Sequence, residues 1–272
     1  MKQFWLICTC LCASYSIKGQ SYRSADTLFS KGSYAQASIL YEKAYFFNEE
    51  VKSRETFLLK KAECKKRLGL YEDAYQTLSR IPIKKDSVSQ VVSAEKILMA
   101  YLENDAPKVE NELLKYKLRF GAPISNNLKI IQFLNYVQLE KLEDARSYLT
   151  ANQNLLSDTN QLTQIVPENL KFKSEKKARN LSMFFPGVGQ MYAGYWFKGL
   201  VSGGVQAGLI TFTAWSFYTG YFFTGTLSGA ALFQNFYVGG IRYSGQLAER
   251  KNQEIKNNIS HRFFQQIKNP EL

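Results

Sequence analysis

The chain has 272 residues, of which 45% are hydrophobic and 14% aromatic, and its net charge is +12. This composition is too apolar for a disordered chain and supplies enough residues for one or two packed domains. Residues 171–272 carry 12 Lys or Arg and 4 Asp or Glu, on both sides of an uncharged run. This distribution favours membrane lipids, rather than nucleic acid, as the partner of the excess charge.

The first 20 residues have the form of a secretory signal peptide. Lys2 precedes a short apolar stretch, residues 4–13, which small and polar residues follow. The stretch is too short to span a bilayer, and we expect cleavage between Ser14 and Gln20. An uncleaved anchor is the alternative.

Three of the four cysteines, Cys8, Cys10 and Cys12, lie in this segment. A lipoprotein that uses one of them is the weaker interpretation, because no convincing run of small residues precedes any of the three. Cleavage leaves only Cys64, which excludes an internal disulfide and a zinc site built from cysteines.

A spacing pattern recurs every 35 to 37 residues within residues 21–160. The first copy is Gly32, Tyr34, Ala37, Tyr41 and Ala44, and the second is Gly69, Tyr71, Ala74, Leu78 and Ile81. A fainter third copy is Asn104, Ala106, Val109, Leu113 and Tyr116, and the fourth is Glu140, Leu142, Ala145 and Leu149.

The pattern is typical of paired helices. Glycine permits the turn, the small residue three positions into each second helix allows close approach, and the larger residues fill the groove. Residues 57–69 and 128–140 have the apolar spacing of the preceding helices. The pattern resembles the tetratricopeptide family, although the third and fourth copies lack the glycine. The alternative is a generic helical bundle.

Membership of that family implies a short helical solenoid that binds an extended peptide or a partner helix, or else serves as a spacer. One repeat helix carries five clustered cations, Lys60, Lys61, Lys65, Lys66 and Arg67. We interpret them as a solvated helix face rather than as a binding patch.

Residues 161–185 are predicted to form a basic linker and an interfacial helix. Ser174 can cap a helix from Glu175 to about Phe185, which Pro186 and Gly187 end. Its cations, Lys176, Lys177 and Arg179, and its apolar side chains are typical of a segment that lies in the membrane interface.

A second pattern begins in this helix and continues into residues 186–247, the predicted two-span membrane domain. Its members are Ser182, Pro186, Gly187, Gly189, Gln190, Tyr192, Gly194, Lys198 and Gly199. It resembles the signature of a bacterial family of two-span membrane domains of unknown function. The resemblance implies a membrane hairpin without an assigned activity. Aromatic residues such as Trp196 suit headgroup depth, where Lys198 can snorkel. An interfacial turn alone gives Gln190 no role.

No residue from Gly199 to Ile241 is charged, a run of 43. We expect two spans, residues 199–223 and 227–243, joined by a turn at residues 224–226. A buried hairpin in a soluble protein is the alternative. Small residues four apart, at 199/203, 204/208 and 225/229, would let the helices touch.

Three polar side chains fall inside the predicted spans: Gln206, Gln234 and Asn235. Folding the hairpin at Gly225 would place Gln234 and Asn235 beside Trp215 and Ser216, where they could form hydrogen bonds or contact another copy.

Residues 248–272 predict a basic amphipathic helix. Its apolar stripe comprises Leu247, Ile255, Ile259, Phe263 and Ile267, and a frayed tail is the alternative.

No catalytic constellation, metal site or cofactor motif is evident in the sequence. His261, the only histidine, lies near the end of the chain, and Cys64 lies in a repeat helix. We therefore predict that the protein is not an enzyme and has no cofactor.

The leading hypothesis is a membrane-anchored scaffold of the bacterial cell envelope, whose repeats bind an unidentified protein. The alternative is an oligomeric hairpin with a transport or lipid-handling role that the repeats regulate. A signal peptide would place the repeats in the periplasm, whereas the basic flanks of the hairpin favour the cytoplasm. We prefer the periplasm, at the inner membrane, with the outer membrane as the alternative.

Overall fold

The computed structural model describes residues 23–121, 125–156 and 162–267. These residues form helices and no strand, which confirms the predicted all-α class for the described part of the chain. The predicted signal peptide, residues 1–20, lies outside the described residues. The chain divides into two compact units between Leu139 and Glu140.

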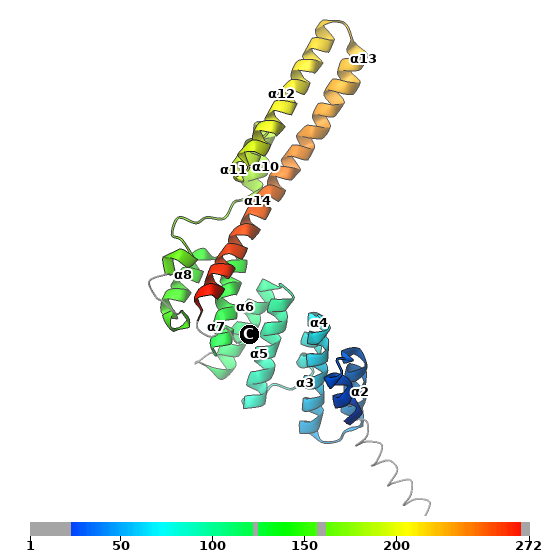
Figure 1. The fold of residues 1–272 in the computed structure, drawn as a ribbon, viewed down its shortest axis with the longest axis vertical. Helices are drawn as coiled ribbons and strands as arrows, with labels where there is room; N and C mark the ends of the chain where they lie inside the picture. Colours follow the sequence, from blue (N-terminus) through cyan, green and yellow to red (C-terminus); the bar gives the residue numbers. More distant parts are fainter. Residues whose placement is uncertain (1–22, 122–124, 157–161, 268–272) are drawn as a thin grey trace, which may run out of the picture. The chain divides into compact units, whose positions relative to one another are not determined.

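The first unit begins with helical residues 23–30. The helices that follow are α2 (Tyr34–Phe47), α3 (Val51–Arg67), α4 (Tyr71–Ser79), α5 (Ser87–Leu102), α6 (Ala106–Phe120) and α7 (Asn126–Gln138) (Figure 1). Each of α2 to α6 packs against the next helix in the chain. The helices predicted over residues 57–69 and 128–140 are present as parts of α3 and α7.

The repeated positions have the structural roles that the spacing predicts. Helices α2, α4 and α6, together with α8 (Leu142–Ala151) of the second unit, begin at the second position of each copy. The third position is fully buried in all four copies: Ala37, Ala74, Val109 and Ala145 have no exposed surface. In the first unit, where consecutive helices pack against one another, close helix packing accounts for the burial of Ala37, Ala74 and Val109.

The turns persist where the glycine is lost. The first position has a positive φ of 78° at Gly32 and 74° at Gly69, but also of 65° at Asn104 and 61° at Glu140. At Asn104 the backbone N–H donates to the carbonyl of Tyr101 at 2.9 Å, in the manner of a left-handed helix cap. Asparagine tolerates this conformation well, and glutamate does so at a cost.

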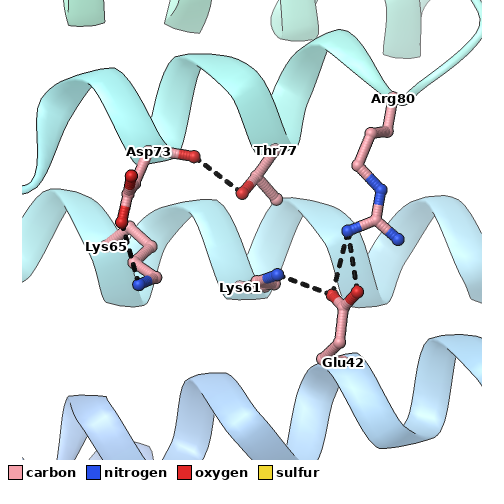
Figure 2. A network of polar contacts seen from close by, with 6 residues as sticks. All are labelled: Glu42, Lys61, Lys65, Asp73, Thr77 and Arg80. Carbon is pink, nitrogen blue, oxygen red and sulfur yellow. Dashed lines mark hydrogen bonds and ion pairs between the residues drawn. The ribbon is translucent and has the colours of Figure 1, made fainter.

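Four of the five clustered cations of α3 bind carboxylates of other helices, and Arg67 pairs with Glu63 of α3 itself, so they do not form the open solvated face that the sequence suggests. Lys61 Nζ lies 2.7 Å from a carboxylate oxygen of Glu42 on α2, and Arg80 lies 2.8 Å from the other oxygen (Figure 2). Lys65 pairs with Asp73 at 3.1 Å. Burial raises the pKa of Glu42, but the hydrogen bonds and charges of Lys61 and Arg80 outweigh it, and the net effect is a lowered pKa.

The second unit contains α8, the short 3-10 helix η1 (Gln153–Leu155) and α9 (Leu162–Ile165). The remaining helices are α10 (Glu175–Phe184), α11 (Val188–Tyr192), α12 (Trp196–Tyr218), α13 (Phe222–Thr224), the π-helical η3 (Gly225–Ala230) and α14 (Ala231–Gln266). The last three join without a break, so residues 222–266 form one long helix that runs beside α12 (Figure 1). Residues 248–266 therefore continue the second hairpin helix instead of forming a separate one.

The end of the long helix is fastened within its unit, so residues up to Gln266 do not form a frayed tail. Leu247, Ile259 and Phe263 of the predicted stripe are buried. Arg262 donates a hydrogen bond to the carbonyl of Gln164 at 2.9 Å. Asn252 both accepts from the backbone N–H of Lys173 at 2.7 Å and donates to its carbonyl at 2.9 Å.

The predicted turn at residues 224–226 is wrong. The chain reverses at Gly220, whose φ is 81°, and the N–H of Tyr221 bonds to the carbonyl of Ser216 at 2.8 Å. Gly225 is instead helical and buried, because its bare Cα packs against Ser216 and Phe217 of α12. The two hairpin helices therefore begin and end at other residues than the predicted spans.

Among residues 23–267, the gaps excepted, no helix combines the length and the apolarity needed to cross a membrane. This finding does not support the two predicted spans.

Candidate functional site

The helical hairpin formed by α12 and the long helix has an unusual distribution of polarity. The residues of α12 that are buried are Gly199, Gln206 and Ser216. Its large apolar side chains point outward: Phe197 is 78% exposed and Trp215 65%. The repeat helices show the opposite arrangement, with α3 burying Phe57, Leu58, Ala62 and Cys64. The hairpin thus has a small and polar interior and an apolar exterior.

The helix before the hairpin forms as predicted. Ser174 caps α10 by accepting a hydrogen bond from the N–H of Lys177 at 3.3 Å, and the helix ends at Phe184, before Pro186. It does not lie free, because it packs along α14 and buries Ala178 and Ser182.

The glycines of the second sequence pattern let neighbouring helices pack in close backbone contact. Gly187 has a φ of 90°, and a Cβ there would overlap the carbonyl oxygen of Gly199. A Cβ on Gly199 would lie 2.6 Å from the carbonyl oxygen of Gly187, and one on Gly203 would lie 3.1 Å from that of Pro186. These contacts join the start of α11 to the first turns of α12. We call this meeting point of α10, α11, α12 and α14 the junction.

Two more contacts complete the junction. A Cβ on Gly189 would overlap the carbonyl oxygen of Ala178 and the hydroxyl of Ser182, so α10 and α11 touch through backbone. Gly194, with a φ of 94°, ends α11. On α14, the side chain of Arg179 packs against Gly245, where a Cβ would overlap the Nε of Arg179.

Tyrosines tie the junction to its charged surroundings. Tyr192 accepts a hydrogen bond from the N–H of Ser174 at 3.2 Å, and Tyr195 donates one to Glu254 at 2.9 Å. Lys198 donates to the hydroxyl of Tyr243 at 3.0 Å, and its ammonium lies 4.9 Å from the ring centre of Tyr195. The ammonium is thus held between two aromatic rings.

The amide of Gln190, which the sequence left without a role, is buried inside the hairpin with only 2% of the residue exposed. Its Nε2 lies 4.0 Å from where a Cβ of Gly240 would be, and the Nε2 of Gln206 and the hydroxyl of Ser202 approach the same point at 3.3 Å and 3.5 Å. Gln206 donates to Ser202 at 3.3 Å, while its Oε1 has no hydrogen-bond partner among the described residues.

An open groove of about 590 Å³ lies beside these amides. Helix α11 contributes Gln190; α12 contributes Phe197, Lys198, Val201, Ser202 and Val205; α14 contributes Asn235, Phe236, Gly239, Gly240 and Tyr243. Lys198 is the single charged residue of this lining, and it lies at the end of the groove nearest the start of α12. The groove is therefore apolar along its length and cationic at one end.

The expected pairing of Gln234 and Asn235 with Trp215 and Ser216 is wrong. Both side chains are exposed, and Asn235 lines the groove with Val205. Placing the turn at Gly220 instead of Gly225 shifts the facing residues along α12.

The predicted small-residue pairs differ in their use. Close contacts are made by the pairs Gly199/Gly203 and Gly225/Gly229, and Gly229 lies against Thr213 of α12. A Cβ on Gly204 or Gly208 would meet nothing within 4 Å, so this pair makes no contact of the predicted kind within the described chain.

The repeat unit contains a polar pocket of about 440 Å³. Lys96 and Glu112 form a buried ion pair in it at 3.4 Å, and Lys115 binds the other carboxylate oxygen at 2.6 Å. Arg119 adds a third cation to the lining.

The sequence singled out two side chains with possible catalytic chemistry, His261 and Cys64. His261 is exposed, and burial raises the pKa of the Cys64 thiol to about 11, which disfavours the nucleophilic thiolate. Groups of His, Cys, Asp or Glu that could hold a metal are absent from the described part of the chain.

The sequence missed the partners that α14 supplies to the junction: Gly240, Tyr243, Gly245 and Asn252. The small residues Gly239, Gly240 and Gly245 could have indicated these contacts, because small residues allow a helix to approach its neighbours closely. No protein-family model, curated protein or solved structure matches this chain.

Proposed function

We propose that the chain is a non-catalytic scaffold of the bacterial cell envelope, anchored in a membrane by its hairpin, with tetratricopeptide-like repeats that bind a protein partner. The observation that carries the anchoring is the reversed polarity of the hairpin. Outward side chains such as Phe197 and Trp215 would be costly in water, whereas Gln206 and Ser216 point inward. Lipid favours this arrangement.

The reversed polarity accounts for the moderate mean apolarity of each hairpin helix. An average over a helix counts the inward Gln206 and Ser216 equally with the outward Phe212. Only the outward residues would meet lipid if the two helices inserted as a pair. The basic residues at the junction would then face anionic headgroups.

The partner-binding role rests on the repeat unit. Its helices pack in consecutive pairs, and its polar pocket combines three cations with a single carboxylate, Glu112. Such a pocket suits an acidic segment of another protein. Replacing Arg119 with Glu should lower the yield of a specific crosslinked partner in cells, while Lys129→Glu, an equal charge change outside the pocket lining, should not.

Fluorescence quenching tests the anchoring. Single-tryptophan variants would carry Ile210→Trp on the outward face of α12 or Leu118→Trp on the repeats, with Trp5, Trp196 and Trp215 replaced by Phe. In reconstituted vesicles, lipids with brominated acyl chains should quench the tryptophan at position 210 and not that at 118. Quenching of position 210 by aqueous iodide instead would refute the anchoring.

A further inference from the structure

The groove of the hairpin has the polarity of an amphiphile-binding site. Val201, Val205 and Phe236 line its length, and the ammonium of Lys198 lies at one end. Positions 198 and 205 are about 10 Å apart along α12, at about 1.5 Å per residue. The volume of about 590 Å³ lies within the range of small-molecule sites.

The charged end is arranged to bind an oxyanion. Tyr243 accepts a hydrogen bond from Lys198 at 3.0 Å, so its own hydroxyl hydrogen can be donated to a ligand oxygen. The rings of Tyr195 and Tyr243 lie 4.9 Å and 5.5 Å from the ammonium and restrict its position. No acidic residue lines the groove to compete for this charge.

We propose that this groove binds one anionic glycerophospholipid, with the phosphate on Lys198 and Tyr243 and an acyl chain along Val201, Val205 and Phe236. The proposal deepens the proposed function and rests on it for the supply of lipid. A second copy of the chain that lay parallel to the first, as a shared membrane orientation would require, would bring its own basic junction against Lys198, and this disfavours it as the occupant. Gln190 gains a role here, as a buried amide in the wall of the groove.

Two pairs of variants test the site. Gly239 lines the groove, and a Cβ there meets nothing within 4 Å, so Gly239→Leu should fill the groove without disturbing the fold. Gly208→Leu is its control, because a Cβ at 208 is equally unobstructed but lies outside the lining. Lys198→Gln removes the cation at the groove, and Lys176→Gln removes an exposed cation elsewhere on the basic flank.

The assay is native mass spectrometry of the full chain, delipidated in mild detergent and titrated with phosphatidylglycerol or phosphatidylcholine. Both lipids offer a phosphate to Lys198, but the quaternary ammonium of phosphatidylcholine would bring a second cation close to it. We therefore expect wild type to prefer phosphatidylglycerol about tenfold. Lys198→Gln should abolish the preference, and Gly239→Leu should lower binding of both lipids at least about tenfold. The two control variants should behave as wild type, and a thermal unfolding curve should show that all four variants are folded.

Equal binding of the two lipids by wild type, or undiminished binding by folded Gly239→Leu, would overturn the proposal. A dimer that replaces the lipid and is lost in Gly239→Leu would assign the groove to a second copy and would also overturn it. The titration needs no bilayer. Iodide quenching at position 210 together with selective lipid binding would therefore refute only the anchoring. Quenching of position 210 by brominated lipids, together with unselective lipid binding, would refute only the groove.

Discussion

A methyl group at position 189 provides a sharp test of the junction. Glycine to alanine in a helix ordinarily stabilises by up to about 1 kcal/mol, because alanine has the higher helix propensity. At Gly189 the added Cβ would overlap the backbone carbonyl oxygen of Ala178 and lie 2.9 Å from its carbonyl carbon. A flexible side chain could move aside, but this contact is with the backbone of α10.

The cost follows from what must move. Helix α10 buries Ala178 completely, and its shift would loosen its packing on α14. Overpacking in a close-packed site costs up to about 3 kcal/mol, and the gain in propensity offsets about 1 kcal/mol. We therefore expect Gly189→Ala to destabilise the second unit by about 2 kcal/mol. The matched change Gly208→Ala, where the Cβ meets open space, should be neutral or stabilise by up to about 1 kcal/mol.

Tryptophan fluorescence during thermal unfolding in mild detergent measures this difference. With Trp5 replaced by Phe, the remaining Trp196 and Trp215 both report on the second unit. An apparent melting temperature of Gly189→Ala equal to or above that of Gly208→Ala would refute the backbone contact between α10 and α11.

Three further outcomes follow from the structure. Ser182→Ala should be neutral or stabilise by up to about 1 kcal/mol in the same melting assay, because the buried hydroxyl has no hydrogen-bond partner among the described residues. Glu112→Gln should destabilise the repeat unit by about 3 kcal/mol at pH 7, measured by denaturant titration followed by circular dichroism, because Lys96 stays buried without its carboxylate partner. Burial raises the pKa of Glu112, but Lys115 and Lys96 outweigh it, and the net effect is a pKa below 4.5. The stability that the ionised carboxylate contributes should therefore be complete above pH 4.5 and be lost as the pH falls through the lowered pKa. The Gln variant should not show this loss of stability. Native Cys64 should react with a maleimide at pH 7.5 at least about a hundredfold more slowly than in denaturant, with Cys64→Ser as the blank; equal rates would contradict its burial.

The repeat unit could be predicted from the sequence in some detail. Spacing located the second helix of every pair and the buried position at Ala37, Ala74, Val109 and Ala145. The signal is strong because the same position of each copy is buried, by alanine in three copies and by valine in the other. What spacing could not predict was that Glu140 would take the positive φ of the missing glycine, because glutamate disfavours this conformation and no local signal in the sequence indicates it.

The candidate site could be predicted in part. The sequence identified the glycines of the junction and the residue that lines the groove from α11, Gln190. It could not say what these residues contact, because Gly240, Tyr243 and Gly245 come from a helix about 50 positions later in the chain.

By itself, the sequence determined the helical class, the period of the repeats and the place where α10 ends before Pro186, because these depend on residues close to one another in the chain. Only the tertiary structure decided that the hairpin turns at Gly220. Gly220 and Gly225 are both glycines beside threonines, and local propensity does not separate them. Packing does, because Gly225 lies against Ser216 and Phe217 in the helix interface while Gly220 has the positive φ of a turn. That choice sets the register of α12 against the long helix, and with it the groove that Lys198 and Tyr243 close at one end.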